Sequence, residues 1–241
     1  MKKLIILLMA CLVIAGQAWS QKTVVDENAQ KRKLSGYHSI QIMHGIDLYL
    51  TQSDQEEVAV SASETKYRDN IVTEVRDGVL TISYGDEEQK WWKGGWINRK
   101  LKAYVSIKTL RKLRASGGSD VTIEDVISAD DLSIDISGGS DLKANFTCNL
   151  LSLTASGGSD ADLKGKATRL RINASGGSDV NAYQLTSDFC NVKCSGGSDV
   201  NVYAAKSIDA NASGGSDIHY KGTPSETKTN KSGSSDIRRV L

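Results

Sequence analysis

LSLTASGGSD at residues 151–160 and LRINASGGSD at residues 170–179 are two copies of one repeat. Its last five residues, SGGSD, recur through the second half of the 241-residue chain, and the closing aspartates are spaced 21, 19, 19, 20, 18 and 19 residues apart. The copies, the last of which is degraded to SGSSD, end at Asp120, Asp141, Asp160, Asp179, Asp199, Asp217 and Asp236. A period near 19 residues that recurs this often is typical of a solenoid, in which each repeat forms one turn.

Apolar and polar residues alternate on both sides of the motif. Leu151 and Leu153 precede it in one copy, Val180 and Ala182 follow it in the next, and a polar residue separates each pair. A period of two indicates half-buried strands, which such a short unit can bury only by stacking on its neighbours. The glycine pair allows a sharp bend between two strands. We therefore predict an all-β fold, a parallel β-helix with about seven coils of 18–21 residues over residues 109–241.

The last repeat is polar where the others are apolar. Thr227, Thr229 and Lys231 stand at the apolar positions, and Arg238 and Arg239 come soon after the motif. A polar terminal coil discourages pairing with the strands of another chain. We therefore predict that this repeat is a C-terminal cap.

Three cysteines lie beyond the N-terminal apolar run. Cys190 and Cys194 fall nine and five residues before Asp199, where other copies carry Leu, Ile and Ala, so they align with core positions. Cys148 lies two coils earlier in another column, which places it about 9–10 Å from Cys190. A disulfide needs Cα atoms within about 7 Å. We predict three free, buried thiols that behave as small hydrophobic side chains.

The N-terminus has the organisation of a secretory signal peptide. Two lysines precede an apolar run over residues 4–16, and small residues stand at Ala18 and Ser20. We expect cleavage after Ser20, so that residues 1–20 are removed and the protein is exported to the periplasm, the outer-membrane surface or the extracellular space. The run is shorter than the about 20 residues of a membrane-spanning helix. Lipidation at Cys11 is the alternative.

The remaining chain has a balanced charge and an irregular first half. Cleavage would change the formal net charge from +1 to −1, because it removes two lysines. A strongly basic face, typical of nucleic-acid binding, is therefore not expected. Residues 21–35 are polar and predicted to be flexible. Residues 36–108 contain short alternating strands without a clean period, which are either irregular first coils of the solenoid or a small sheet that caps it.

One stretch of the first half, together with the repeats, resembles a known family. HGIDLYLTQ at residues 44–52, followed by the Ser-Gly-Gly coils, is similar to the bacterial head GIN domain proteins, labelled "putative auto-transporter adhesins". The resemblance extends from about Tyr37 to Tyr220. It implies a β-helical, exported protein without an assigned catalytic activity, and it supplies no site residues.

The seven aspartates of the motif are the first candidate site. Coils in register would place them in one column with about 4.8 Å between neighbours, where like charges repel by roughly 1 kcal/mol in water and about 3–4 kcal/mol at an effective dielectric of 20. The structural interpretation is that each carboxylate accepts hydrogen bonds from turn N–H groups and serine hydroxyls. The functional one is calcium bound between neighbouring aspartates. A Ser/Asp surface that binds a glycan or a mineral is a third alternative.

The second candidate site is KWWKGGW at residues 90–96. Trp91, Trp92 and Trp96 stand together amid glycines and cations. Their rings could stack on sugars or lie at a membrane interface. The alternative is that they plug the end of the solenoid.

An enzyme is not predicted. The three histidines are scattered, and no motif for a nucleophile, a metal or a phosphate has a recognised spacing. A β-helix enzyme acting on polysaccharides is the remaining alternative, but it needs two carboxylates in different environments. The sequence therefore favours an exported, non-catalytic β-solenoid that acts as a cell-surface or envelope adhesin, with a glycan or another cell-surface component as partner. A calcium-stabilised repeat protein that uses the aspartates is an alternative prediction, and no other cofactor is expected.

Overall fold

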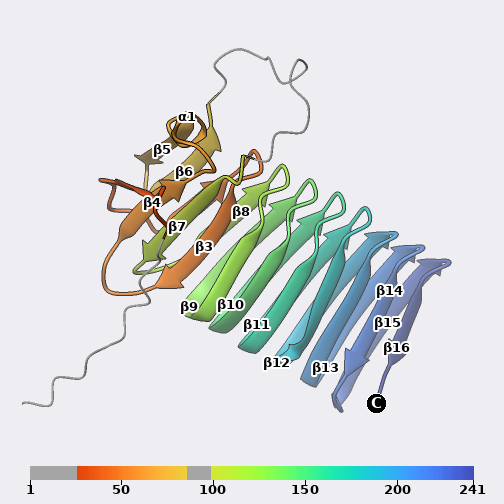
Figure 1. Ribbon diagram of the computed structural model, residues 1–241. Coiled ribbons are helices and arrows are strands. Elements are labelled where there is room, and N and C mark those ends of the chain that lie inside the picture. Colours follow the sequence, from red (N-terminus) through yellow and green to blue (C-terminus); the bar gives the residue numbers. More distant parts are fainter. Residues whose placement is uncertain (1–25, 86–98) are drawn as a thin grey trace, which may run out of the picture.

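The computed structural model describes residues 26–85 and 99–241, which form sixteen strands of one sheet and one helical turn (Figure 1). The first part contains β1 (Gln30–Arg32), β2 (Ser39–Ile42), β3 (Asp47–Gln52), β4 (Glu57–Ser61), α1 (Thr65–Arg68), β5 (Ile71–Arg76), β6 (Val79–Tyr84) and β7 (Lys102–Ile107). The second part contains β8 (Lys112–Ser116), β9 (Val121–Ser137), β10 (Leu142–Ser156), β11 (Ala161–Ser175), β12 (Asp179–Gly196), β13 (Asp199–Gly214), β14 (Asp217–Lys221), β15 (Glu226–Gly233) and β16 (Asp236–Arg239).

The long strands β9 to β13 stack in chain order, each parallel to the next. Their register places equivalent residues of successive repeats side by side, so that Leu153, Ile172, Val192 and Ala210 form one buried column. Such columns arise because a coil buries its apolar face only against its neighbours. The predicted all-β fold, a parallel β-helix, is confirmed.

The glycine pair forms a row of turns along one edge of the solenoid (Figure 1). Gly196 has a φ of +79°, a left-handed conformation that side chains disfavour. A Cβ at this position would also lie 2.8 Å from the carbonyl oxygen of Gly176 in the preceding coil. The first glycine is therefore required both by the bend and by the close stacking of the turns.

The first half of the chain continues the same sheet, but out of chain order. Strands β2 and β3 pair in parallel with β8 and β9 on one side and with β6 and β7 on the other. Residues 39–52 therefore form a coil between the regular repeats and the strands β6 and β7, which come later in the chain. The division of the chain at residues 35 and 108 stays a prediction.

Antiparallel strands cover the N-terminal end of the stack. β1 pairs with β4, β4 with β7, and β5 with β6, all antiparallel. Asp77 and Gly78 turn the chain between β5 and β6 with φ values of +51° and +74°, as expected for a hairpin signal. Tyr37 is buried at this end, and its hydroxyl donates a hydrogen bond to the carbonyl oxygen of Ser106 at 2.7 Å.

The C-terminal coil is polar, and its role as a cap stays a prediction. β15 pairs in parallel with β13, and Thr227, Thr229 and Lys231 take the register positions of apolar residues in β13. Every residue of β15 is exposed.

The three cysteines are free and buried, which confirms the prediction of three free, buried thiols. Burial raises the pKa of Cys148, Cys190 and Cys194 to about 11, so the thiols stay protonated near neutral pH. They are packing residues, and not nucleophiles.

The predicted signal peptide at residues 1–20, including Cys11, lies outside the described residues. In the part of the chain that is described, no helix has the length and apolar character to cross a membrane.

Candidate functional site

The seven aspartates of the motif form one column. Asp179, Asp199, Asp217 and Asp236 are register partners in successive strands. Hydrogen bonds from backbone amides to carboxylates connect the earlier members, as from Asp141 to Asp120 at 3.2 Å. The further bonds of this kind are 3.0–3.4 Å long and run from Asp160 to Asp141, Asp179 to Asp160, Asp217 to Asp199 and Asp236 to Asp217.

The charges of this aspartate column are satisfied differently from the sequence expectation. The donors to the carboxylates are amides of the next coil, whereas serine hydroxyls and the local turn were expected. The side chains range from exposed to half-buried, so water reaches them. Burial is the main cause that raises the pKa of Asp179; the backbone amide of Asp199 opposes this rise, and the charges of Asp160 and Asp199 add to it. Burial and the charges of the neighbouring aspartates therefore both disfavour the ionised form of Asp179.

The second serine of the SGGSD motif is buried, which the sequence analysis did not predict. Its six copies are 0% exposed: Ser119, Ser140, Ser159, Ser178, Ser198 and Ser216. The hydroxyl of Ser140 accepts a hydrogen bond from the amide of Ser119 at 3.0 Å, and the same contact recurs in the following coils. The signal was available, because a residue next to an outward aspartate must point inward in a strand.

An eighth aspartate, Asp47, extends the column. Leu48 pairs with Val121, which places Asp47 level with Asp120. Burial, followed by the charge of Asp120, raises the pKa of Asp47. His44 and Gly45 before it have φ values of +68° and +69°, like the glycines of the repeats. HGID is therefore a further copy of the turn, which SGGSD alone could not reveal.

Cations end the aspartate column on both sides. Lys102 takes the register position next to Asp47. At the other end the ammonium of Lys231 donates to Asp236 Oδ1 at 3.2 Å, and this hydrogen bond is the main cause of the lowered pKa of Asp236. The described residues contain no group of three or more His, Cys, Asp or Glu side chains that could hold a metal ion. Calcium at the column stays a prediction, and it requires added calcium to raise the melting temperature of chelator-treated protein by several degrees.

The other candidate site, Trp91, Trp92 and Trp96, lies outside the described residues. Arg99, which follows it, lies over the rings of Tyr67 and Tyr84, with its guanidinium carbon 5.8 and 5.0 Å from the ring centroids.

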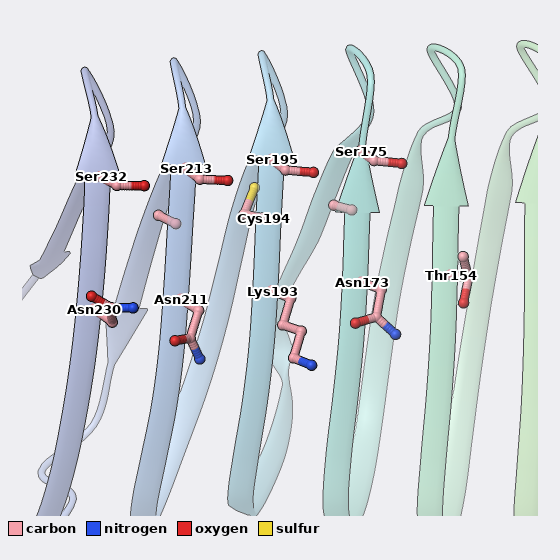
Figure 2. A pocket seen from close by; sticks show the side chains of 12 residues that line it. Thr154, Asn173, Ser175, Lys193, Cys194, Ser195, Asn211, Ser213, Asn230 and Ser232 are labelled. Carbon is pink, nitrogen blue, oxygen red and sulfur yellow. The ribbon is translucent and has the colours of Figure 1, made fainter.

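A groove of about 380 Å³ runs across the coils on the face that precedes the motif (Figure 2). Two columns of outward side chains line it. The first is Thr154, Asn173, Lys193, Asn211 and Asn230, and the second is Ser175, Ser195, Ser213 and Ser232. The sequence reasoning missed this groove, although the polar residues at alternate positions had been noticed.

Fold and surface together define a class: a parallel β-solenoid whose outer faces carry ladders of identical polar side chains. Residues 36–224 match the family model described as "Putative auto-transporter adhesin, head GIN domain". The chain belongs to this head GIN domain family, as the resemblance in the sequence implied.

Solved structures have the same fold. A crystal structure of a "putative adhesin" from Bacteroides fragilis is 24% identical, with a TM-score of 0.80, and the match covers 88% of this chain and 96% of that one. A "putative lipid binding protein" from Parabacteroides distasonis is 24% identical over 90% and 98% of the chains, with a TM-score of 0.68. A "putative adhesin" from the same species is 22% identical over 88% and 96%, with a TM-score of 0.70. The comparison with curated proteins gives no match.

Proposed function

We propose that this protein is an exported, non-catalytic binding module that attaches to a cell-surface or envelope component. The observation that carries the proposal is the repetition of outward side chains at equal spacing, as in the register of β10 to β13. Such a surface makes many equal contacts with an extended partner, and their summed strength grows with the number of coils engaged.

The aspartate column favours binding over catalysis. Glycoside hydrolysis needs one carboxyl group that holds its proton and a second that is ionised. Asp160 and Asp199 each accept a hydrogen bond from the backbone amide of the aspartate in the next coil. This uniformity supports a role in binding, in which the aspartates present a row of negative charges to a partner.

Export is supported by the predicted signal peptide at residues 1–20 and by the adhesin label of the family. We expect the full chain, expressed with a C-terminal tag, to lose about 20 residues by mass spectrometry and to leave the cytoplasm. Recovery of the uncleaved chain in the cytoplasm would contradict export.

Retention on surfaces tests the binding function. Protein 21–241 is applied to immobilised peptidoglycan, outer-membrane vesicles, mucin and neutral polysaccharides, with urea-denatured protein of the same composition as control. We expect saturable retention of the folded protein on at least one surface. Retention on none would refute the binding module, and release of reducing ends from a bound polysaccharide would refute its non-catalytic nature.

A further inference from the structure

The groove on the face before the motif carries hydrogen-bonding side chains, most of which have no partner among the described residues. Its two columns run along the solenoid axis through β10, β11, β12, β13 and β15 (Figure 2). Within each column the side chains repeat at the strand spacing of about 4.8 Å. The groove therefore presents serine hydroxyls in one column and amides at three of the five positions of the other, Asn173, Asn211 and Asn230.

These groups are free to bind a ligand. Across the described residues, the amides of Asn173 and Asn230 and the hydroxyls of Ser175, Ser195 and Ser213 make no hydrogen bond with the protein. Some asparagines outside the groove do find partners.

Two asparagines outside the groove show the difference. The amide of Asn181 donates to Asp162 at 2.8 Å, and that of Asn149 donates to Asp130 at 3.0 Å. Both donors are therefore engaged by the neighbouring coil. In the groove, Asn211 donates to Asp209 of its own strand at 3.0 Å, whereas Asn173 and Asn230 keep their amides for solvent or for a ligand.

The composition of the groove excludes most ligand classes. Lys193 is the one charged side chain among its lining residues, so an anionic polymer or a nucleic acid would lack the cations that it needs. The lining holds no aromatic side chain, Met or Arg, the residues in which protein interfaces are enriched. The charged pair of Arg114 and Asp135 lies beyond the groove, nearer the N-terminal end of the same face.

We propose that this groove binds a neutral polysaccharide chain lying along the solenoid axis, across the coils. Hydroxyl groups donate and accept hydrogen bonds, as do asparagine amides and serine hydroxyls, and a polymer of identical sugars offers them at regular intervals. Each bond contributes little by itself, so affinity depends on the number of coils engaged. The proposal rests on the function proposed above, and it names the ligand class and the face.

The test uses protein 21–241 and affinity electrophoresis in gels that contain mannan, dextran or laminarin, with alginate as the anionic comparison. We expect retardation by at least one neutral polymer and a loss of about tenfold or more in affinity for Asn173→Ala/Asn211→Ala/Asn230→Ala. The matched control is Asn149→Ala/Asn181→Ala/Asn201→Ala, which should bind like the unmodified protein. Equal melting temperatures of the two variants would exclude misfolding as the cause.

Two single variants sharpen the result. Ser195→Tyr leaves every groove amide in place but fills the groove, and it should abolish retardation. Lys166→Ala, at an exposed lysine outside the groove lining, should leave neutral retardation unchanged.

The two proposals fail separately. If a neutral polymer retards the protein equally with and without the groove asparagines, the groove assignment is wrong while the binding module stands. If no neutral polymer retards it but another envelope surface retains it, the ligand class is wrong. If nothing retains it, both proposals are overturned.

Discussion

The regular coils (residues 121–221) and the N-terminal coils (residues 39–85 and 99–107) build one sheet by different means. In the regular coils the stacking order is the chain order, and a glycine pair makes every turn. In the N-terminal coils β2 and β3 lie between β6–β7 on one side and β8–β9 on the other, although all four of these strands come later in the chain. His44 and Lys100 adopt left-handed conformations there, with φ values of +68° and +46°. The difference teaches that stacking needs buried apolar columns and a bend at each corner, whereas polar columns need a repeated sequence.

The largest effect should come from breaking a turn of the regular coils. Gly196→Ala places a Cβ in a left-handed residue and 2.8 Å from the oxygen of Gly176, and we expect a loss of about 2–5 kcal/mol in unfolding free energy. Gly118→Ala is the matched control, because its φ is +74° but no atom lies within 4 Å of the added Cβ. It should cost only about 1–2 kcal/mol. Equal losses in urea unfolding would contradict the role of close stacking.

The buried serine ladder should come next. Ser178→Ala removes the hydroxyl that accepts a hydrogen bond from the amide of Ser159 at 3.2 Å, and a buried donor left unpaired costs about 1–3 kcal/mol. Ser175→Ala, in the groove, should change stability by less than about 0.5 kcal/mol. Chemical denaturation of both variants measures the difference, and hydrogen exchange at the amide of Ser159 locates it. A neutral Ser178→Ala would mean that the ladder is not needed for stability.

A substitution in the N-terminal coils should stabilise them. Lys100 is exposed with a φ of +46°, and Lys100→Gly relieves this conformation, with a gain of up to about 1 kcal/mol. Thermal unfolding measures the change. Lys108→Gly, at an exposed residue outside the left-handed positions, is the control and should not stabilise. A loss of stability in Lys100→Gly would show that the turn does not follow the rule of the regular coils.

The smallest effect should come from the middle of the aspartate column. The pKa of Asp179 is raised in the folded protein by burial and by its neighbours, so the ionised carboxylate opposes folding above this pKa. The penalty disappears as the pH falls through the folded pKa towards the ordinary value of 3.8. Asp179→Asn should therefore stabilise the protein at pH 7 by less than about 1 kcal/mol, and the gain should vanish near pH 3.

The end of the column provides the comparison. The pKa of Asp236 is lowered, mainly by Lys231, so Asp236→Asn should weaken folding slightly at pH 7 and have no effect once the carboxyl is protonated in both states. Melting temperatures across pH 3–7 measure both variants. If Asp179→Asn and Asp236→Asn changed stability at pH 7 in the same direction, the assignment of repulsion to the middle of the column would be contradicted.

Part of the site could be predicted from the residues. Asp160 and Asp179 were aligned by counting, and Cys190 and Cys194 were placed in the core by the same alternation, because strand geometry is local and periodic. Asp47 was missed, since Ile46 replaces the serine and His44 replaces a glycine in its copy. The tryptophans at residues 91–96 remain a prediction.

The sequence by itself determined the period of the solenoid, the inward and outward faces of its strands and the sharp turns, because alternation and glycine conformations act over a few residues. Only the tertiary structure decided that β2 and β3 stack between β6–β7 and β8–β9, that amides of one coil satisfy the carboxylates of another, and that a groove forms between the asparagine and serine columns. Those features depend on contacts between residues about one coil or more apart, and such contacts exist only once the coils have stacked.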